Sequence, residues 1–420
     1  MELLIAHGRS GSGMSLGPNI LPLFEQLGML EDIYAISRPA HSIDMHVGDG
    51  TFVGGLDMSK HQEWTGYPTI IFHRPQLHSL MLSKLALKKI HYSKRVLSTG
   101  QNENGVLIRC QDGTTYEGDI LVGADGAYSA VRQSLYEQLD KMGCLPQSDS
   151  QTMLVGHSCL VGTTNDLDEV QYPVVKGDTS HFAVLVADDL PHSVTLNTVP
   201  GNRICWAVRV MMDGQEKDTS FRNSEWGPES IESMVKQVSH HKIPFGGTLG
   251  DLIEATPKNL ISRVFLEEKC FETWHHQRTV LLGDACHKML PSGGQGATNA
   301  MQDAVVLANG IYDLQSTSLE DVEAALKDYR QQRYAHAKQQ VDRSAGVGRV
   351  MHGRAWFARF VRNVILNWMP ASLEKMRFSK AYAYRPQAVF LPLAENRGEF
   401  QVLPQRPSKR EVKGQTDTSN

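Results

Sequence analysis

Apolar residues recur at helical spacing in two stretches near the start of the chain, residues 15–36 and residues 74–90. This periodicity predicts a turn followed by a helix in the first stretch and a helix in the second. Pro22 fits the first helix only if it lies in the opening turn, because proline has no N–H to donate to a helix interior.

A hairpin is expected next. Residues 106–110 alternate in a strand-like manner, and Asp112-Gly113 supplies a tight turn into a second strand. A short strand at residues 119–122 follows and ends in the sequence Gly-Ala-Asp-Gly of residues 123–126. Glycines beside an acid at a strand end let the backbone turn closely around a ligand.

The pattern changes between residues 150 and 265. Val194 and Leu196 alternate with polar neighbours, and after the turn at residues 200–202 the alternation continues from Ile204 to Val210. Such alternation predicts an antiparallel sheet with one buried face, which we expect to form a layer separate from the α/β part of the chain.

The α/β pattern returns at residues 279–282, a short apolar run expected to be a buried strand that ends in Gly283-Asp284. A glycine-rich loop at residues 292–296 then precedes a helix. The apolar face of that helix is expected to carry Met301, Ala304, Val305, Ala308, Ile311 and Tyr312. Another helix is expected from Ser318, with Asp321 in the position of a capping partner.

Composition narrows the class of protein only slightly. The 420 residues are 41% hydrophobic and 21% charged, with a net charge of -4, which gives no indication of nucleic-acid binding. None of the six cysteines forms a Cys-x-x-Cys pair, so a reducing, intracellular location is the simpler expectation. The chain opens without the features of a signal peptide, and no apolar stretch reaches the ~20 residues that span a bilayer.

The two strand–turn segments, 119–126 and 279–296, are the candidates for a site. Backbone N–H groups at the start of the helix after residue 296 favour an anion by ~0.3–1 kcal/mol. Asp284, at the strand end, can accept hydrogen bonds from sugar or ribityl hydroxyls. From the residues alone, an ordinary structural glycine turn explains the second segment about equally well and the first segment better.

Together these segments resemble two fingerprints of the class A flavoprotein monooxygenases. The matching stretches are DGTTYEGDILVGADGAYSAVR and VLLGDACHKMLPSGGQGATNAMQDAVVLA, in the family's order and with a β-rich segment between them. Several other collinear stretches, among them GPNILPLFEQLG and RPQAVFLPLAENRGEF, are similar to fungal monooxygenases of meroterpenoid and indole-diterpene pathways.

The resemblance implies an FAD site and a reaction in which NAD(P)H and O2 place one oxygen atom in a substrate. It assigns cofactor contacts to Arg74, to Gly123, Asp125 and Gly126 of the earlier fingerprint, and to Gly283, Asp284, Pro291, Gly294, Gly296 and Ala297 of the later one. His192, where relatives tend to have an aromatic residue facing the substrate, is the candidate catalytic acid or base. A plain surface histidine is the interpretation we favour for it.

The family's opening Gly-x-Gly-x-x-Gly unit is absent. Residues 8–13 contain three glycines, but their spacing is Gly-x-x-Gly-x-Gly. Gly13 is retained as a cofactor-binding candidate, and Glu2 as a remnant of the acid that holds the adenosine ribose; an unrelated acid is an equal alternative for Glu2. The enzyme is therefore expected either to start further upstream or to be a weakened or relict member of the family.

Two other features have structural explanations beside functional ones. The adjacent pairs His240-His241 and His275-His276 do not have metal-ligand spacing, so no metal is expected. Residues 343–369 contain five arginines and no acid, interleaved with Trp356, Phe360 and other apolar residues. This segment fits either packing of its apolar face on the domain, which we favour, or peripheral association with an anionic membrane surface.

The predicted fold is α/β plus antiparallel β: a Rossmann-like FAD-binding domain, incomplete at its start, with an inserted β-sheet substrate domain and C-terminal helices. The FAD-binding domain is expected in two segments, residues 1–150 and 266–345, on either side of the β-rich substrate domain at residues 151–265. A helical region at residues 346–396 and a disordered tail at residues 397–420 complete the expected organisation. The expected function is epoxidation or hydroxylation of a lipophilic prenylated or polyketide-derived metabolite. Its rivals are a salicylate-hydroxylase-like aromatic hydroxylase and a non-catalytic relict.

Overall fold

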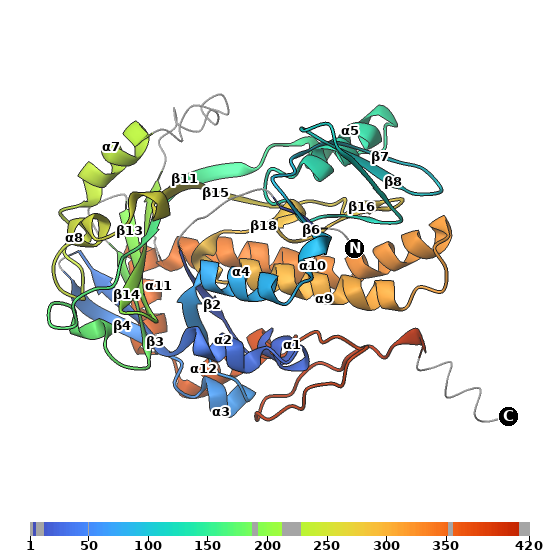
Figure 1. Cartoon of the computed structure of the whole chain (residues 1–420). Helices are drawn as coiled ribbons and strands as arrows, with labels where there is room; N and C mark the ends of the chain where they lie inside the picture. The colour runs from blue at the N-terminus through green and yellow to red at the C-terminus, as the bar shows by residue number, and fades with distance from the viewer. Residues whose placement is uncertain are drawn as a thin grey trace.

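The structure, a computed structural model, describes residues 3–5, 12–48, 50–186, 192–211, 228–351 and 356–410. A large sheet stands at one end of the molecule, and the long helices α9 (Gly296–Tyr312) and α10 (Leu319–Met351) run side by side from it toward the other end (Figure 1). A smaller group of strands with helix α5 (Ala130–Lys141) lies above their far ends. The α/β plus antiparallel β fold class is therefore confirmed.

The large sheet has ten strands in the order β18-β15-β11-β14-β13-β12-β3-β5-β2, with β4 paired to β3. Its strands are β2 (Gly13–Leu16), β3 (Ser37–Val47), β4 (Thr51–Asp57), β5 (Ile70–His73), β11 (Leu154–Thr163), β12 (Ser180–Val186), β13 (His192–Val199), β14 (Arg203–Met211), β15 (Ser262–Cys270) and β18 (His287–Lys288). All neighbours are antiparallel except the parallel pair β3–β12. The strands before the two candidate segments, β10 (Leu121–Gly123) and β17 (Thr279–Leu281), lie outside this sheet, but β2, β3, β4 and β5 from before residue 150 belong to it.

The predicted alternation along β13 and β14 sets the two faces of this sheet. Leu196, Trp206 and Val208 face outward and pack against α7 (Pro228–Val238) and α8 (Leu249–Glu254) in one buried cluster. The opposite, inner face packs against Leu290 in the glycine-rich region. The inner face is therefore the side of the sheet that adjoins the candidate site.

Parallel strands form two separate pairs. Strand β10 (Leu121–Gly123) pairs with β17 (Thr279–Leu281), which also pairs with β16 (His275–His276); β1 (Leu3–Ile5) pairs with β6 (Ile90–Tyr92). No ladder joins these two groups within the described residues. The predicted hairpin is present as β8 (Val106–Cys110) and β9 (Thr115–Gly118), next to β7 (Val96–Gln101). Apolar residues of α5, β17, α9 and α10 pack together in one buried core.

In place of the first predicted helix, the structure has two short helices, α1 (Leu21–Gln26) and α2 (Leu30–Ala35). Gly28 between them has φ +64°, a conformation that ends a helix, and Pro22 lies in the first turn of α1 as expected. The second predicted helix, α4 (Arg74–Ser83), stops before residue 84. The remaining short helices are α3 (His61–Thr65), α6 (Gln147–Ser150), η1 (Leu87–Lys89), η2 (Pro173–Val175), η4 (Lys258–Leu260), η5 (Gly283–Ala285) and η6 (Pro291–Gly293).

Helix α9 buries only part of the face expected: Val305 is buried, and Met301 packs against the cluster around α1 and α2. Ala304 is exposed, and Ile311 and Tyr312 are 37% and 39% exposed. Asn299, Gln302 and Asp303 are instead almost fully buried, against α10. The hydrophobic pattern is incomplete here because the two helices contact each other through these polar groups as well as through apolar residues such as Val306 and Leu326. Ser318 caps α10 as expected, since its hydroxyl accepts a hydrogen bond from the Asp321 N–H, but the Asp321 carboxylate accepts from the Ser316 hydroxyl and does not complete the capping box.

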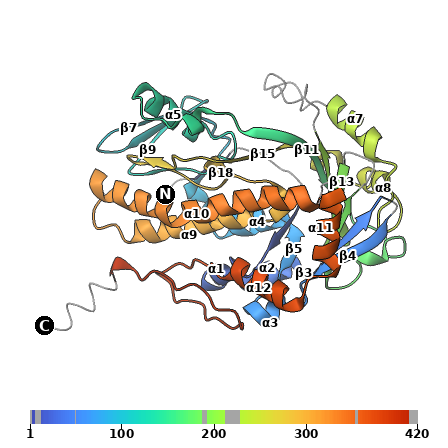
Figure 2. The ribbon, with the colours of Figure 1, turned by 180° about the vertical axis from the view of Figure 1, so that it is seen from behind.

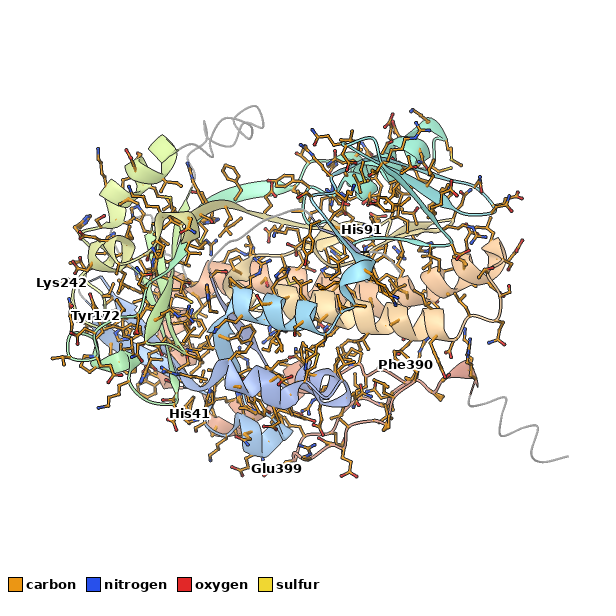
Figure 3. All side chains as sticks on the ribbon, in the orientation of Figure 1. His41, His91, Tyr172, Lys242, Phe390 and Glu399 are labelled. Atoms are coloured by element: carbon orange, nitrogen blue, oxygen red, sulfur yellow. The ribbon has the colours of Figure 1, made fainter. Side chains whose placement is uncertain are left out.

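The C-terminal region contains α11 (Trp356–Asn367) and α12 (Ala371–Tyr382), after which the chain returns along α1 and α3. Phe390 and Glu399 mark this returning segment at the base of the molecule (Figure 3). The expected disorder from residue 397 is wrong for residues 397–410, because Phe400 and Ser408 are buried and Ser408 donates a hydrogen bond to Asp313. Residues 411–420 lie outside the described segments of the chain. No described helix combines the length and apolar character needed to span a bilayer.

Candidate functional site

The glycine-rich loop joins β17 to α9 through two short 3-10 turns. Gly283 and Gly294 have φ +61° and +63°, which only glycine adopts without strain. Helix α9 then begins at Gly296, with Ala297 in its first turn. The first amides of a helix have no carbonyl partner within it, so this loop presents N–H groups and the positive end of a 17-residue helix.

The segment after Gly13 lies directly beside this loop. The Asn19 side chain donates a hydrogen bond to the side-chain carbonyl oxygen of Gln295 at 2.9 Å, and Gln302 donates to the Asn19 backbone. A side chain at Gly13 would meet Cys205 of β14 at 3.0 Å. Gly13 is therefore held where three elements meet, β2, the inner face of the sheet and the start of α9, although no direct ligand role follows from its packing.

Asp284 lies in the turn η5, directly after β17. Its carboxylate accepts a hydrogen bond from Lys288 at 2.5 Å, and its side chain remains 36% exposed. Pro291 begins the second turn and is exposed. Gly283, by contrast, is buried, and its N–H donates to Asp303 at 2.9 Å. The structure thus brings together the later set of predicted contacts, Gly283 to Ala297, around one loop.

The predicted contacts of the earlier fingerprint, Gly123, Asp125 and Gly126, can be explained by local structure. Asp125 accepts hydrogen bonds from the Ser129 hydroxyl and the Val131 N–H, so it holds the start of α5. A side chain at Gly123 would come within 2.8 Å of Leu281 and Val131. Gly126 has φ +83° with open space around it. Ligand contacts of these three residues stay a prediction.

Arg74 is the first residue of α4, and its side chain is exposed. Its N–H donates to the backbone of Ser12 at 3.0 Å, which places the start of α4 next to the strand that carries Gly13. Glu2 lies outside the described residues, as do residues 6–11.

His192 is not a surface histidine, because only 8% of it is exposed. It alternates in register with Val194 and Leu196, which belong to the outer cluster of the sheet. Its ring centroid lies 5.7 Å from that of His241, just before α8. His192 therefore faces away from the glycine-rich loop, and the structure gives no support for a catalytic role.

The inner face carries a residue that the sequence analysis missed, Arg209 of β14. Its guanidinium donates to the Ser292 hydroxyl at 3.2 Å and contacts the His157 ring at 3.1 Å, while its buried Nε has no hydrogen-bond partner. Burial lowers the pKa of Arg209, an effect that Cys159 and Glu268 partly offset. The alternation that buries Trp206 and Val208 on one face already places Arg209 on the other, so the signal was present in the sequence.

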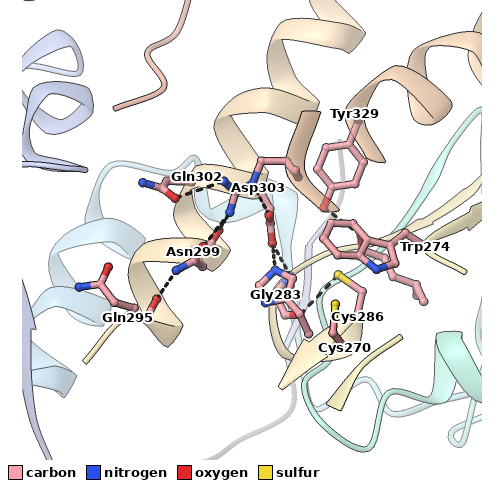
Figure 4. A network of polar contacts seen from close by, with 12 residues as sticks. Cys270, Trp274, Gly283, Cys286, Gln295, Asn299, Gln302, Asp303 and Tyr329 are labelled. Atoms are coloured by element: carbon pink, nitrogen blue, oxygen red, sulfur yellow. Dashed lines mark hydrogen bonds and ion pairs between the residues drawn. The ribbon is translucent and has the colours of Figure 1, made fainter. Parts of the chain in front are cut away.

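Beneath the loop lies a buried polar network (Figure 4). Asp303 accepts hydrogen bonds from His287 Nε2 at 2.5 Å, from the Gly283 N–H and from Arg333 Nε at 2.7 Å, and Arg333 also donates to Asn299 at 3.0 Å. Burial raises the pKa of Asp303, but His287 and Arg333 outweigh it and bring the pKa to about 2. The network ties the turn η5 to both long helices and so fixes the loop from below.

Cys286, His287 and Asp303 place one potential metal-ligand atom each within 4.8 Å of one another, among the residues that the structure describes. Both Asp303 oxygens already accept hydrogen bonds, one from the Arg333 guanidinium. Burial raises the pKa of the Cys286 thiol well above its usual value, which keeps it protonated. A guanidinium and a neutral thiol make this group an ion-pair network rather than a cation site.

The geometry of the glycine-rich loop suits the flavin and ribityl half of a flavin dinucleotide. The N–H groups at the start of α9 can receive the negative charge of a flavin ring, and Asp284 can accept hydrogen bonds from hydroxyls of the ribityl chain. Two buried side-chain oxygens lack a hydrogen-bond partner: Oδ1 of Asn19 beside the loop and Oδ1 of Asn197 on the sheet. Buried polar atoms are normally hydrogen-bonded, so these two are available to a ligand. The fold and the glycine-rich loop together define a protein that binds a nucleotide cofactor beside the inner face of its large sheet.

Comparison with known proteins gives the family. The FAD binding domain family matches residues 9–344. Over 346 residues the chain is 30% identical to the FAD-dependent monooxygenase ausM of Penicillium brasilianum, covering 80% of this chain and 70% of that protein. It is 29% identical to ausM of Aspergillus calidoustus over 409 residues, 93% and 82% of the two chains. The crystal structure of Klebsiella pneumoniae HpxO with FAD and uric acid has a TM-score of 0.72 at 22% identity, covering 92% and 91%.

The chain belongs to the FAD binding domain family and is an FAD-dependent monooxygenase, as its two fingerprints indicated. The resemblance on which the expected cofactor rests is thereby confirmed.

Proposed function

We propose that this protein inserts one oxygen atom from O2 into a lipophilic, prenylated or polyketide-derived intermediate of fungal secondary metabolism, by epoxidation or hydroxylation. NAD(P)H supplies two electrons and one proton as a hydride, solvent supplies a second proton, and the second oxygen atom leaves as water. The FAD, when bound, carries the electrons from NAD(P)H to oxygen. Similarity to the monooxygenases of Penicillium and Aspergillus supports the reaction class, and the fungal-type stretches of the sequence support the substrate class.

One observation carries the proposal: the inner face of the sheet lies against the glycine-rich loop. Cys159, Leu266 and Leu290 form a buried apolar cluster between them. Such a cluster excludes water, which protects a reactive oxygen-transfer step from competing hydrolysis and uncoupling. The start of α9 stabilises negative charge on the same side. The chain's own residues therefore orient the reacting groups and keep the site dry.

Arg209 is the specific observation that favours the rival activity, hydroxylation of a phenolic substrate. A guanidinium on the inner face with an unpaired Nε suits a phenolate or carboxylate oxygen better than a hydrocarbon olefin. In the favoured interpretation, Arg209 instead binds a polar head group of the prenylated molecule. In both interpretations Arg209 is a substrate-recognition residue.

The test starts with FAD retention. The purified chain is incubated with FAD, passed through a gel-filtration column and examined by visible spectroscopy. NADH and NADPH oxidation are then compared with a farnesylated phenol, an unprenylated phenolic acid and no substrate, and products are weighed by mass spectrometry. A product one oxygen atom heavier from the farnesylated substrate supports the proposal. Oxygenation of the phenolic acid alone supports the rival, and a colourless, inactive protein supports the relict interpretation.

Arg209→Met, with Arg203→Met on the same strand as the matched control, then separates the two roles of the guanidinium. The loss of turnover with phenolic acid alone indicates recognition of an anion. An equal loss with both substrates indicates that Arg209 supports the loop through Ser292.

A further inference from the structure

Helix α11 is oriented opposite to what its composition predicts. The buried residue is Arg362, whose guanidinium donates to the Met351 carbonyl at 3.1 Å. The aromatic side chains point outward: Trp356, Phe357 and Phe360 are 78%, 61% and 59% exposed. The packing interpretation favoured from the sequence therefore holds only in part: Leu366 packs on the large sheet, whereas the aromatic side chains of α11 stay exposed.

The exposed apolar residues form one continuous face. Trp356, Phe360, Val364 and Trp368 follow one another at intervals of four residues, and Trp368 continues the helical hydrogen bonding with its N–H donated to Val364. Residues four apart lie on the same side of a helix. Large exposed apolar patches of this kind mark interaction surfaces in proteins.

Contacts with the large sheet hold α11 in this orientation. Asn367 donates a hydrogen bond to the Val53 carbonyl of β4 at 2.9 Å, and Leu366 packs with Met45 and Val184 of the large sheet. In Figure 2 the helix lies beside β4 at the end of α10, on the outside of the molecule. Because the opposite side of the helix is already packed, its aromatic face cannot be buried by a simple rotation.

Positive charges predominate around this face. Residues 343–369 contain five arginines and no acid; of these, Arg343, Arg349 and Arg359 are exposed among the described residues. Helix α12 adds exposed Lys375, Arg377 and Lys380. The acids that flank the region are Asp342 and Glu374, and Glu399 pairs with Lys375 at 2.6 Å. Cations therefore outnumber acids beside the aromatic face.

We propose that α11 docks the protein on an anionic lipid bilayer, lying in the plane of the surface with Trp356, Phe360, Val364 and Trp368 inserted among the lipids. Tryptophan and phenylalanine favour the boundary between head groups and acyl chains, and arginines beside them attract anionic head groups. A second copy of this chain is the less suitable occupant, because it would bring the same arginines face to face. The proposal does not depend on the identity of the substrate.

The experiment is vesicle flotation of the FAD-loaded chain, with neutral phosphatidylcholine vesicles and with vesicles that also contain phosphatidylserine. We expect flotation with the anionic vesicles, weaker flotation with the neutral ones, and loss of the difference at high salt. The triple variant Trp356→Ser, Phe360→Ser, Trp368→Ser should lose at least about tenfold in bound fraction. The control variant Leu87→Ser, Leu97→Ser, Val170→Ser, which changes three exposed apolar residues elsewhere, should float like the parent.

Tryptophan fluorescence gives a second readout. Among the described tryptophans, Trp356 and Trp368 are exposed, whereas Trp64, Trp206 and Trp274 are buried, so most of a blue shift on vesicle addition should disappear in Trp356→Phe, Trp368→Phe. Circular dichroism and the flavin spectrum check that each variant is folded. Equal flotation of parent and triple variant overturns the proposal. So does a parent chain that ignores vesicles but forms dimers, by light scattering, that the triple variant does not form.

Discussion

Asp303 and Arg333 form a completely buried ion pair, with the guanidinium Nε 2.7 Å from the carboxylate and neither side chain exposed. Asp303 lies on α9 and Arg333 on α10, so the pair joins the two long helices. The other carboxylate oxygen accepts hydrogen bonds from His287 and from the backbone of Gly283. One buried carboxylate therefore positions the loop that carries most of the predicted flavin contacts.

Breaking this pair should be more costly than removing it. Asp303→Asn or Arg333→Met alone leaves a buried group without its partner, and each should lower the free energy of unfolding by about 3–5 kcal/mol. The double variant should lose less than the sum of the two. Urea denaturation followed by circular dichroism measures all four proteins. Strict additivity would show that the two side chains do not stabilise each other.

His61 should make the fold sensitive to mild acid. It is fully buried beside Phe378, and burial lowers its pKa to about 4, although Asp57 acts in the opposite direction. Because unfolded histidine has a pKa near 6.5, only the unfolded chain gains this proton as the pH falls from about 6.5 to 4. Stability contributed by neutral His61, up to about 3 kcal/mol, is lost over that window.

The variant His61→Leu should reduce the pH dependence of stability between pH 6.5 and 4 by the share of one proton, leaving the slope due to other buried histidines such as His73 and His275. His41→Leu, at an exposed position, is the control and should leave the slope unchanged. Thermal unfolding at a series of pH values decides the matter. An unchanged slope in His61→Leu would contradict the assignment.

Gly123 should be required for packing. An alanine there would come within 2.8 Å of Leu281 and Val131, so Gly123→Ala should destabilise the protein by about 1–3 kcal/mol, even without flavin. Gly100 lies in a strand with no atom within 4 Å of an added Cβ, and Gly100→Ala should be close to neutral. Thermal unfolding of both variants without FAD provides the comparison. A stable Gly123→Ala protein that has lost only FAD affinity would instead favour a direct ligand role.

Asp284 should be required for flavin retention and not for folding. Its carboxylate is partly exposed and bonds only to Lys288 among the contacts observed, so Asp284→Ala should leave the unfolding midpoint nearly unchanged. The yellow colour after gel filtration should be lost. Asp32→Ala is the matched control, because Asp32 is also paired with an exposed lysine, Lys84, at 2.6 Å but lies far from the loop in sequence. An Asp284→Ala protein that stays yellow and active would refute the role of Asp284.

Local patterns in the sequence determined much of the fold. Alternation predicted β13 and β14, turn residues predicted the β8–β9 hairpin, and the glycine-rich stretch after Asp284 predicted the loop before α9. These features depend on neighbouring residues in the chain, and their backbone preferences act locally. The FAD fingerprints were recognisable for the same reason, since each is a short segment with fixed spacing.

Only the tertiary structure decided which contacts are made between distant segments. Nothing local indicates that β3 pairs with β12 or that Asp303 meets Arg333. The failures of the hydrophobic pattern have the same origin: α9 buries polar groups because α10 satisfies them, and α11 exposes aromatic ones because Arg362 finds a carbonyl partner below. Periodicity tells which residues share a face, but the energy of burying that face depends on the partner across it.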